Sequence, residues 1–596
     1  MTSEPEKTKL SAKTSKFATK IWPGVRRVVP ILTWARTYDR AWLQPDLISA
    51  VTIWGVMTPT SMAYAEMAGL PAVNGLYAAM ISLAFYSLFA SSRHVKVTTS
   101  STVAILSYSV VVALAGGDPA RFMALSAGLA LVMGTLLLLA GIFHLGFLSD
   151  FLSRPIVTGF VFGLALVIIV GQVPKMLGVP AGEGNFFEQA WAMLLSLGDA
   201  LPLTVLLGVG ALVMLRVLKR SLPQVPAAPI VLAVGMIVVA LFDLDAKGVA
   251  VVGSVPSGLP ELTVPRFTLA DFTALLAGAF SIAFLAMGET VGMGRAFALK
   301  HHYDLDSDQE LLGLGVANIG TGLFQGFAVD GSMSTSATAE ASGGKTQLTA
   351  LISAGFVLLT LLFLAPLFAF VPQAVLGALV VNSVVGLVSV PALRELYAQR
   401  RRDFLLAMAA LIGILLSDVM VGLTLAVFLS LIIVLYSASR PTIAVLGELP
   451  EKPGAFGDIA RHPECLQIPG LLILRIDSPL YYFNVNFVGR LIREQVTARQ
   501  DTINTLLIDV GASSDLDLTT IDGLQALIAQ LIERGIGVMY AQVRGGVRER
   551  LRRVGARQEL YDSFFPTVAY AVEVYVQRQA GHPPAELLEQ GDGPLA

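Results

Sequence analysis

Apolar residues dominate the chain from residue 47 to residue 438, and short polar stretches divide this region into fourteen blocks. A helix that crosses a hydrocarbon core of roughly 30 Å needs about 20 apolar residues. The pattern therefore predicts an all-α polytopic membrane domain with about fourteen transmembrane segments, some of them short. The predicted segments are 47–66, 72–90, 98–115, 123–145, 156–173, 200–217, 229–243, 271–291, 310–326, 333–342, 348–371, 374–390, 403–419 and 421–438.

After residue 440 the sequence changes to the alternating strand and helix patterns of a soluble α/β domain. Strands are predicted at 470–477, 505–510 and 537–541, and helices at 485–499, 521–534 and 547–554. The predicted regions are a cytosolic tail with a candidate interfacial segment (1–40), the transmembrane domain (41–440), a linker with an edge strand (441–465), the α/β domain (466–580) and a disordered tail (581–596).

Basic residues cluster in the loops that follow even-numbered segments, as Arg93 and Lys96 do after the second and Arg154 does after the fourth. Cytoplasmic loops collect Lys and Arg, so an even number of spans with both termini in the cytoplasm is predicted. Only 14% of the 596 residues are charged, against about 25% in soluble proteins.

The single cysteine, Cys465, excludes an intrachain disulfide. The sequence contains no metal-binding spacing and no nucleophile–base pattern, so an enzyme and a bound cofactor are not predicted.

Two short blocks are rich in hydroxyl groups, Thr98–Ala104 and Gly331–Thr338, and each is third in its group of seven segments. Short segments at matching places in two halves are typical of a transporter binding site. A half-helix that begins inside the membrane presents unpaired N–H groups and a positive dipole end, which can hold an anion. The alternative is that these hydroxyls bond to their own helix or ease helix packing. The paired placement favours half-helices, with Ser100, Ser101, Thr102, Ser334, Thr335 and Ser336 as substrate-binding candidates.

Three further side chains are candidates for a role in transport. Glu289 lies late in an apolar segment, where a carboxylate suggests a proton or ion path; the alternative is a solvated residue beside Arg295. Tyr64 either lines the substrate cavity or packs in the core. Asp330 precedes the second hydroxyl block and is predicted to cap that half-helix.

Several stretches resemble the sulfate permease (SulP) family of anion transporters. They are Thr58–Ala65 (TPTSMAYA), Ala68–Pro71, Gly75–Tyr77, Ser92–Val95 (SRHV), Gly294–Ala298 (GRAFA) and Gly343–Gln347 (GGKTQ). The soluble region, with Pro479–Phe483, is similar to the STAS domain that these transporters carry.

The resemblance implies two inverted seven-helix repeats, with half-helices in third and tenth position, and a homodimer whose core moves like an elevator. It also implies a cell membrane location, in bacteria the cytoplasmic (inner) membrane. Glu289 stands at a family position associated with proton coupling. Thr60 and Tyr64 of the TPTSMAYA stretch complete the set of eight substrate-binding candidates. Thr60 stands where the family often has Gln, and Thr335 where many members have Arg, so anion binding would depend on helix dipoles and hydroxyls.

The sequence therefore predicts a secondary active transporter of an inorganic anion, with sulfate uptake coupled to H⁺ or Na⁺ as the first reading. A bicarbonate or C4-dicarboxylate transporter and an uncoupled anion channel or exchanger remain alternatives, and a nucleobase permease is a distant one. A cytosolic regulatory partner is expected for the STAS domain. Its Asp517–Thr520 turn lacks the Ser and Gly of the phosphorylated turn of soluble relatives, although Thr519 could still be modified.

Overall fold

The computed structural model describes residues 29–36, 38–151, 154–182, 184–222, 227–253, 258–417, 419–553 and 563–580. The predictions for residues 1–28 and 581–596 lie outside this part of the chain. The chain divides into two compact units, residues 1–431 and 432–596. Each unit is described by itself.

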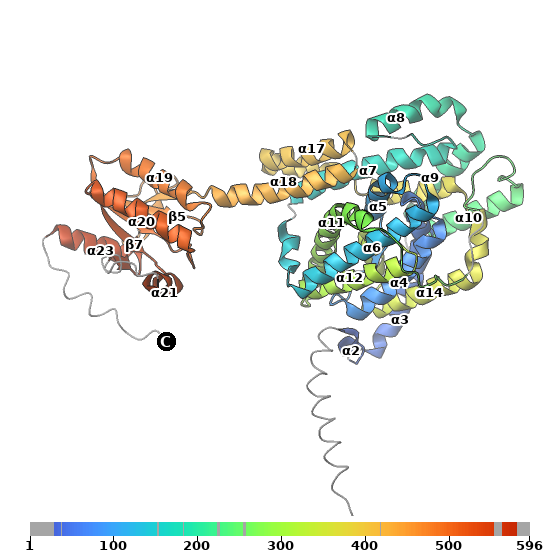
Figure 1. The fold of residues 1–596 in the computed structure, drawn as a ribbon, viewed down its shortest axis with the longest axis horizontal. Coiled ribbons are helices and arrows are strands. Elements are labelled where there is room, and N and C mark those ends of the chain that lie inside the picture. Colours follow the sequence, from blue (N-terminus) through green and yellow to red (C-terminus); the bar gives the residue numbers. More distant parts are fainter. Residues whose placement is uncertain are drawn as a thin grey trace, which may run out of the picture. The chain divides into compact units, whose positions relative to one another are not determined.

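The first unit is helical (Figure 1), and each of the fourteen predicted segments coincides with one of its helices. These are α3 (Leu43–Met67), α4 (Ala72–Phe89), α5 (Ser101–Ala115), α6 (Pro119–Ile142), α7 (Arg154–Leu177), α9 (Pro202–Ser221), α10 (Ala227–Phe242), α11 (Leu269–His301), α12 (Ser307–Leu323), α13 (Met333–Ala341), α14 (Leu348–Leu359), α15 (Gln373–Val385), α17 (Arg401–Leu416) and α18 (Val419–Ser439). Among the described residues, seven helices are long and apolar enough to cross a membrane, and shorter apolar helices such as α5 and α10 accompany them.

Three short helices of the first unit were not predicted from the sequence: α2 (Ile31–Trp34), α8 (Phe186–Leu195) and α16 (Val390–Gln399). Neither α8 nor α16 has a buried residue. Both are shorter than a membrane span, so the search for long apolar blocks passed over them.

The helices pack in two groups that mix the two halves of the sequence. In one group, α12 packs against α6 and α4, α14 packs against α3 and α4, and α11 packs against α6. In the other group, α7 packs against α17, α15 and α9. The α6–α12 contact requires glycine, because a Cβ at Gly134 would lie 2.7 Å from the Gly315 carbonyl oxygen.

Two short strands precede the short helices α5 and α13. β1 (Val97–Thr98) and β2 (Asp330–Gly331) pair antiparallel, although they are far apart in the sequence. The helices that follow have 15 and 9 residues, too few to cross a membrane alone. The two predicted half-helices are therefore confirmed as parts of the fold.

The second unit is an α/β domain with a six-stranded sheet in the order β4-β3-β5-β6-β7-β8. Strands β5 to β8 are parallel, and β3 is antiparallel to both of its neighbours. The strands are β3 (Ile443–Glu448), β4 (Phe456–Asp458), β5 (Gly470–Ile476), β6 (Ile503–Asp509), β7 (Gly537–Ala541) and β8 (Phe564–Phe565). The predicted linker 441–465 supplies β3 and β4, and β3 lies inside the sheet, so this segment is a structural part of the domain.

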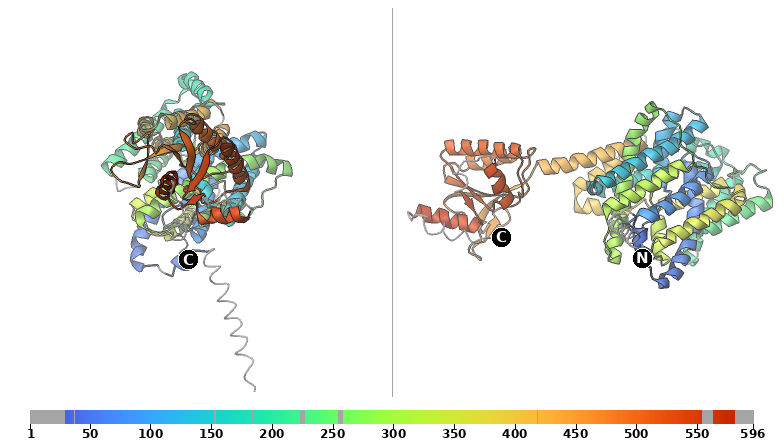
Figure 2. Two further views of the ribbon diagram at one scale, coloured as in Figure 1. Left: turned by 90° about the vertical axis from the view of Figure 1, so that its left-hand side faces the viewer. Right: turned by 60° about the horizontal axis from the view of Figure 1, so that its bottom comes forward.

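Helices cover both faces of this sheet (Figure 2). On one face α19 (Val485–Thr497), α20 (Leu518–Glu533) and α21 (Gly545–Arg553) pack against alternate residues of β5 such as Leu472 and Leu474. On the other face α23 (Val568–Gln579) packs against Leu471 and Ile473. This alternation is the period-2 pattern from which the strand was predicted.

Candidate functional site

The antiparallel strands bring the starts of the two half-helices together. Val97 lies opposite Gly331, and Thr98 lies opposite Asp330. The pairing is extended by the Ser332 N–H, which donates to the Lys96 carbonyl at 3.0 Å, and by the Lys96 N–H, which donates to the Ser336 hydroxyl at 2.8 Å. Each half-helix begins within three residues of its strand, so both N-termini lie at this crossing.

A serine caps each half-helix. The Ser100 hydroxyl accepts from the Val103 N–H, and the Ser332 hydroxyl accepts from the Thr335 N–H, both at 3.3 Å. The prediction that Asp330 caps the second half-helix is wrong, because Asp330 lies in β2 and Ser332 occupies the residue directly before the helix. Each cap satisfies one N–H group and leaves others of the first turn available.

Hydroxyl groups of four helices lie around this crossing. The Ser332 hydroxyl lies 2.9 Å from the Thr335 hydroxyl and 3.3 Å from that of Ser334. On the other half-helix Ser101 and Thr102 are buried in the first turn. Tyr64 of α3 is buried, and its hydroxyl interacts with those of Ser101 and Ser383, the latter on α15.

Two predicted site residues have their hydroxyls engaged elsewhere. The Thr60 hydroxyl donates to the Val56 and Met57 carbonyls of its own helix, each at 3.1 Å. The Ser336 hydroxyl accepts the Lys96 N–H and therefore joins α13 to the approach of β1. Of the eight predicted substrate-binding residues, the structure groups the other six around the crossing, and Ser336 uses its hydroxyl in the strand pairing there.

Two carboxyl groups lie at the same crossing. Glu289 of α11 and Asp330 of β2 are direct electrostatic neighbours. The contact between their elements is close, because the Gly331 N–H donates to the Thr290 hydroxyl at 3.0 Å. Asp330 is fully buried, and neither of its carboxyl oxygens has a hydrogen-bond partner among the described residues.

A cavity of about 610 Å³ reaches Glu289. Its walls come from α7, α11 and the α15–α16 connection, and they include Arg154, Thr158, Gly288, Gly292 and Ser389. The Glu289 side chain is thus enclosed by protein on one side and open to the cavity on the other. Water in this cavity would give Glu289 a route for proton exchange.

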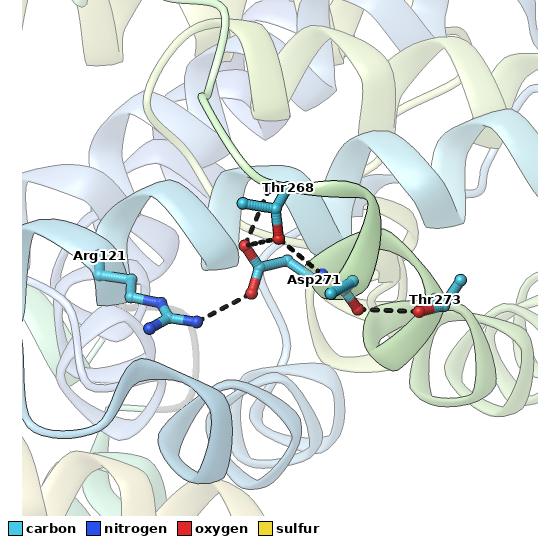
Figure 3. Close-up of polar contacts among 5 residues, drawn as sticks. Arg121, Thr268, Asp271 and Thr273 are labelled. Atoms are coloured by element: carbon cyan, nitrogen blue, oxygen red, sulfur yellow. Dashed lines mark hydrogen bonds and ion pairs between the residues drawn. The ribbon is translucent and has the colours of Figure 1, made fainter.

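The start of α11 is fixed by a polar network at the opposite end from Glu289 (Figure 3). Thr268 and Asp271 form a capping box, and the Thr268 hydroxyl also donates to the Asp271 carboxylate at 2.8 Å. The Arg121 guanidinium of α6 lies 2.9 Å from the other Asp271 oxygen. These contacts join the start of α11, the helix that carries Glu289, to α6.

The loops beside the half-helices are held by buried polar side chains. The Gln347 amide donates to the Ser92 and Val95 carbonyls at 2.8 and 2.7 Å. The Asp46 carboxylate of α3 accepts from the Lys345 N–H and the Thr346 hydroxyl, each at 2.6 Å. The SRHV and GGKTQ motifs are therefore joined to one another and to α3.

The crossing lacks a cationic side chain of its own. Within the described residues, α3, both strands and both half-helices contain neither Lys nor Arg. The same part of the chain contains no group of three His, Cys, Asp or Glu side chains that could hold a metal ion. Lys96 directly precedes β1, but its ammonium donates to the Arg93 and Thr346 carbonyls and to the Gln347 side chain. The strands and half-helices themselves contribute positive potential through the helix N-termini.

Sequence reasoning missed the roles of Ser332, Thr290 and Ser383. A signal for Ser332 was present, because a serine directly before a helix is a preferred N-cap. Thr290 and Ser383 carry no such signal, since only the packing of α11 and α15 brings them to the site.

Two family models match this chain. A model of the sulfate permease family matches residues 43–410, and a model of the STAS domain matches residues 462–571. The first match covers more than half of the chain.

Several curated proteins are similar along nearly the whole chain. A "probable sulfate transporter" of Mycobacterium tuberculosis is 35% identical over 544 residues, covering 91% of this chain and 97% of that protein. The chloroplastic sulfate transporter 4.1 of Arabidopsis thaliana is 30% identical over 573 residues, covering 92% and 82%.

Solved structures show a similar fold. The murine SLC26A9 anion transporter superimposes with a TM-score of 0.85 at 22% identity, covering 93% of this chain and 95% of that one. The transmembrane domain of the cyanobacterium bicarbonate transporter BicA gives a TM-score of 0.58 at 22% identity, covering 66% and 98%.

Proposed function

Because the chain belongs to the sulfate permease family and carries a C-terminal STAS domain, we propose that it takes up sulfate by secondary active transport. The sulfate lies between the N-termini of α5 and α13, where the uncapped N–H groups and the hydroxyls bind it. Uptake is coupled to protons through Glu289. Sulfate is proposed as the substrate because the sulfate transporters of Mycobacterium tuberculosis and Arabidopsis thaliana are similar to this chain over more than nine-tenths of its length.

The observation that carries this proposal is the β1–β2 pair, which sets two hydroxyl-capped helix N-termini against each other. A helix N-terminus attracts anions through its dipole and its free N–H donors. Sulfate offers four acceptor oxygens, and donors from both half-helices could reach it at once. The candidate donors are Ser100, Ser101, Thr102, Tyr64, Ser334 and Thr335, with Thr60 and Ser336 as further members of the predicted set.

Glu289 supplies a proton site next to the proposed anion site. Burial in a membrane domain makes a charged carboxylate costly. An anion that arrives nearby repels the carboxylate charge, and therefore favours binding of a proton to the carboxyl group. The cavity that borders Glu289 supports this role, because it gives the carboxyl group contact with water. A sodium ion is the alternative coupling ion.

The assembly and its location are also part of the proposal. We place the protein in a cytoplasmic (inner) membrane with both termini in the cytoplasm, as a homodimer whose core moves relative to the remaining helices. The two packing groups of helices would allow such a movement. The STAS domain would then face the cytosol, where a regulatory partner can reach it.

Uptake into proteoliposomes tests the substrate. The anions to compare are labelled sulfate, bicarbonate, fumarate and chloride, each with and without an inward proton or sodium gradient. The proposal predicts saturable accumulation of sulfate that depends on the proton gradient. Preference for bicarbonate or fumarate would replace the substrate, and flux of several anions only down their own gradients would identify a channel or exchanger.

A further inference from the structure

We propose that Glu289 and Asp330 act as one proton-sharing pair, in which Asp330 is a positioning residue that tunes proton binding at Glu289. This inference rests on the proposed function, in which Glu289 couples proton movement to anion uptake. It adds a second carboxyl group for which the sequence had suggested only a capping role.

In the described structure, the Asp330 side chain neither caps a helix nor accepts a hydrogen bond. Ser332 performs the capping of α13, and the Asp330 main chain is already used by the pairing with Thr98. The side chain is fully buried, and no donor reaches either of its oxygens in hydrogen-bond geometry. A buried carboxylate without donors is costly, so the group needs a proton or a proton-bearing partner.

Glu289 is the partner that the structure offers. The Gly331 N–H donates to the Thr290 hydroxyl at 3.0 Å, which brings the residues next to Asp330 and Glu289 together. The two carboxyl groups are electrostatic neighbours, and the Ser100 hydroxyl also lies near Asp330. Two adjacent carboxylates in a buried site do not both remain charged, because like charges repel strongly there. One proton on either carboxyl group lets its O–H donate to the other, which satisfies both groups and leaves the pair with one negative charge instead of two.

The surrounding charges do not offer Asp330 a different partner. Tyr64 of α3 is the other titratable group whose electrostatics involve Asp330. Arg154 of α7 lines the same cavity as Glu289, and its guanidinium pairs with Glu395 at 3.5 Å. The Lys96 ammonium donates instead to the Arg93 and Thr346 carbonyls at 3.2 Å and to the Gln347 side chain at 3.4 Å.

The pair has a route for its proton. Glu289 borders the cavity, whereas Asp330 is closed off from solvent. A proton from water therefore arrives at Glu289 and is then shared with Asp330. No other bond forms or breaks in this step.

A shared proton has a direct consequence for the anion. A negative charge on the carboxyl pair repels an anion at the crossing, and the half-helices carry no Lys or Arg to offset it. Each proton that the pair binds removes one negative charge, and an arriving anion in turn favours further protonation. Proton binding and anion binding are thus linked through both carboxyl groups.

Infrared spectroscopy of the purified full-length protein tests the pair without any substrate. The C=O stretch of a protonated carboxyl group is distinct from the carboxylate bands, and its titration can be isolated as the difference between wild type and Glu289→Gln. In Asp330→Asn, Glu289 has lost its like-charged neighbour and should release its proton at lower pH. We expect its midpoint to fall by about one pH unit or more. An unchanged midpoint would overturn the proposal.

The pH profile of sulfate uptake provides a second readout. Asp330→Asn is nearly isosteric, and in this variant the pH of half-maximal uptake should fall by the same amount as the infrared midpoint. Asp245→Asn is the matched control, because it removes one exposed carboxylate in the turn after α10 and should leave the profile unchanged. A profile for Asp330→Asn that coincides with the wild type would contradict the pair.

These outcomes separate the inference from the proposed function. If Glu289→Gln keeps the wild-type pH profile of uptake, the coupling role of Glu289 fails. If the wild type does not take up sulfate, the substrate is wrong. In both cases the infrared midpoint of Asp330→Asn still decides whether the two carboxyl groups share a proton.

Discussion

The backbone N–H of Gly331 donates to the Thr290 hydroxyl at 3.0 Å, which holds the strand before the second half-helix against the helix that carries Glu289. This contact leaves no room for a side chain at position 331. A Cβ there would lie 2.9 Å from the Thr290 hydroxyl oxygen and 2.9 Å from the Met293 methyl carbon. The proposed anion site and the proposed coupling residue are therefore joined by a close backbone approach.

Gly331→Ala should weaken sulfate uptake through this contact. Overpacking costs about 1–3 kcal/mol, and a loss of 1.4 kcal/mol corresponds to about a tenfold change in affinity. The measurement is the KM of sulfate uptake in proteoliposomes. Gly355→Ala on α14 is the control, because a Cβ there meets nothing within 4 Å and should leave uptake unchanged. An unaltered KM in Gly331→Ala would show that the fit of β2 against α11 does not matter for binding.

Ser332→Ala should affect both stability and anion binding. Loss of a serine cap costs about 1 kcal/mol of helix stability. It also removes the hydroxyl that contacts Thr335 at the proposed anion site. Sulfate affinity, measured by calorimetry on the detergent-purified protein, should therefore fall.

Thr567→Ala provides the comparison for the Ser332 cap. Thr567 caps α23 by accepting from the Tyr570 N–H at 3.1 Å, and it lies in the STAS unit. Its loss should cost similar stability and leave sulfate affinity at the wild-type value. Equal effects of both substitutions on affinity would remove the special role of Ser332.

Asp46→Ala should destabilise the membrane unit. Asp46 is fully buried, and its carboxylate accepts from the Lys345 N–H, the Thr346 hydroxyl and the Thr349 hydroxyl. Removing one acceptor leaves several buried donors unsatisfied, at about 1–3 kcal/mol each. We expect a lower thermal unfolding midpoint and a reduced yield of folded protein. A midpoint equal to the wild type would show that the GGKTQ loop does not depend on this residue.

Asp517 should make the stability of α20 depend on pH. Partial burial acts to raise the pKa of Asp517, but hydrogen bonds from the Thr520 hydroxyl, the Thr520 N–H and the Tyr482 N–H outweigh it and hold the pKa below its usual range. A carboxyl group with a lowered pKa contributes stability above its unfolded pKa of about 3.9. This contribution is lost as the pH falls through the folded pKa.

Hydrogen exchange of the α20 amides in the full-length protein measures this effect. After correction for intrinsic exchange rates, protection should fall between neutral pH and about pH 3. Asp517→Asn keeps a good capping group and should remove most of the pH dependence. Asp522→Asn, an exposed change on the same helix, should retain it. Equal pH dependence in both variants would contradict the assignment to Asp517.

Long apolar blocks made most of the fold predictable from the sequence. Membrane helices must satisfy their own backbone groups, so each block of sufficient length had to be a helix. The hydroxyl-rich blocks at Thr98–Ala104 and Gly331–Thr338 differed from this pattern, because they are too short and too polar for an ordinary span. Both contain the start of a half-helix.

The remaining features depend on contacts between distant segments. Asp330 looked like a helix cap from its position in the sequence, but the β1–β2 pairing moves it into a strand and leaves the cap to Ser332. Residues 441–465 were predicted to be a linker with an edge strand. The pairing of β3 with β5, which places β3 inside the sheet, is not visible in local composition. The contact between Asp46 and the GGKTQ loop spans about 300 residues and gives no local signal.

Sulfate accumulation in proteoliposomes under an inward proton gradient, with Glu289→Gln as the paired variant, tests proton-coupled uptake most directly. The wild type should concentrate labelled sulfate above equilibrium and lose this ability when the gradient is collapsed. Glu289→Gln should equilibrate sulfate without concentrating it. Sulfate that never rises above equilibrium in the wild type, or accumulation that is equal in Glu289→Gln, would contradict proton-coupled uptake through this site.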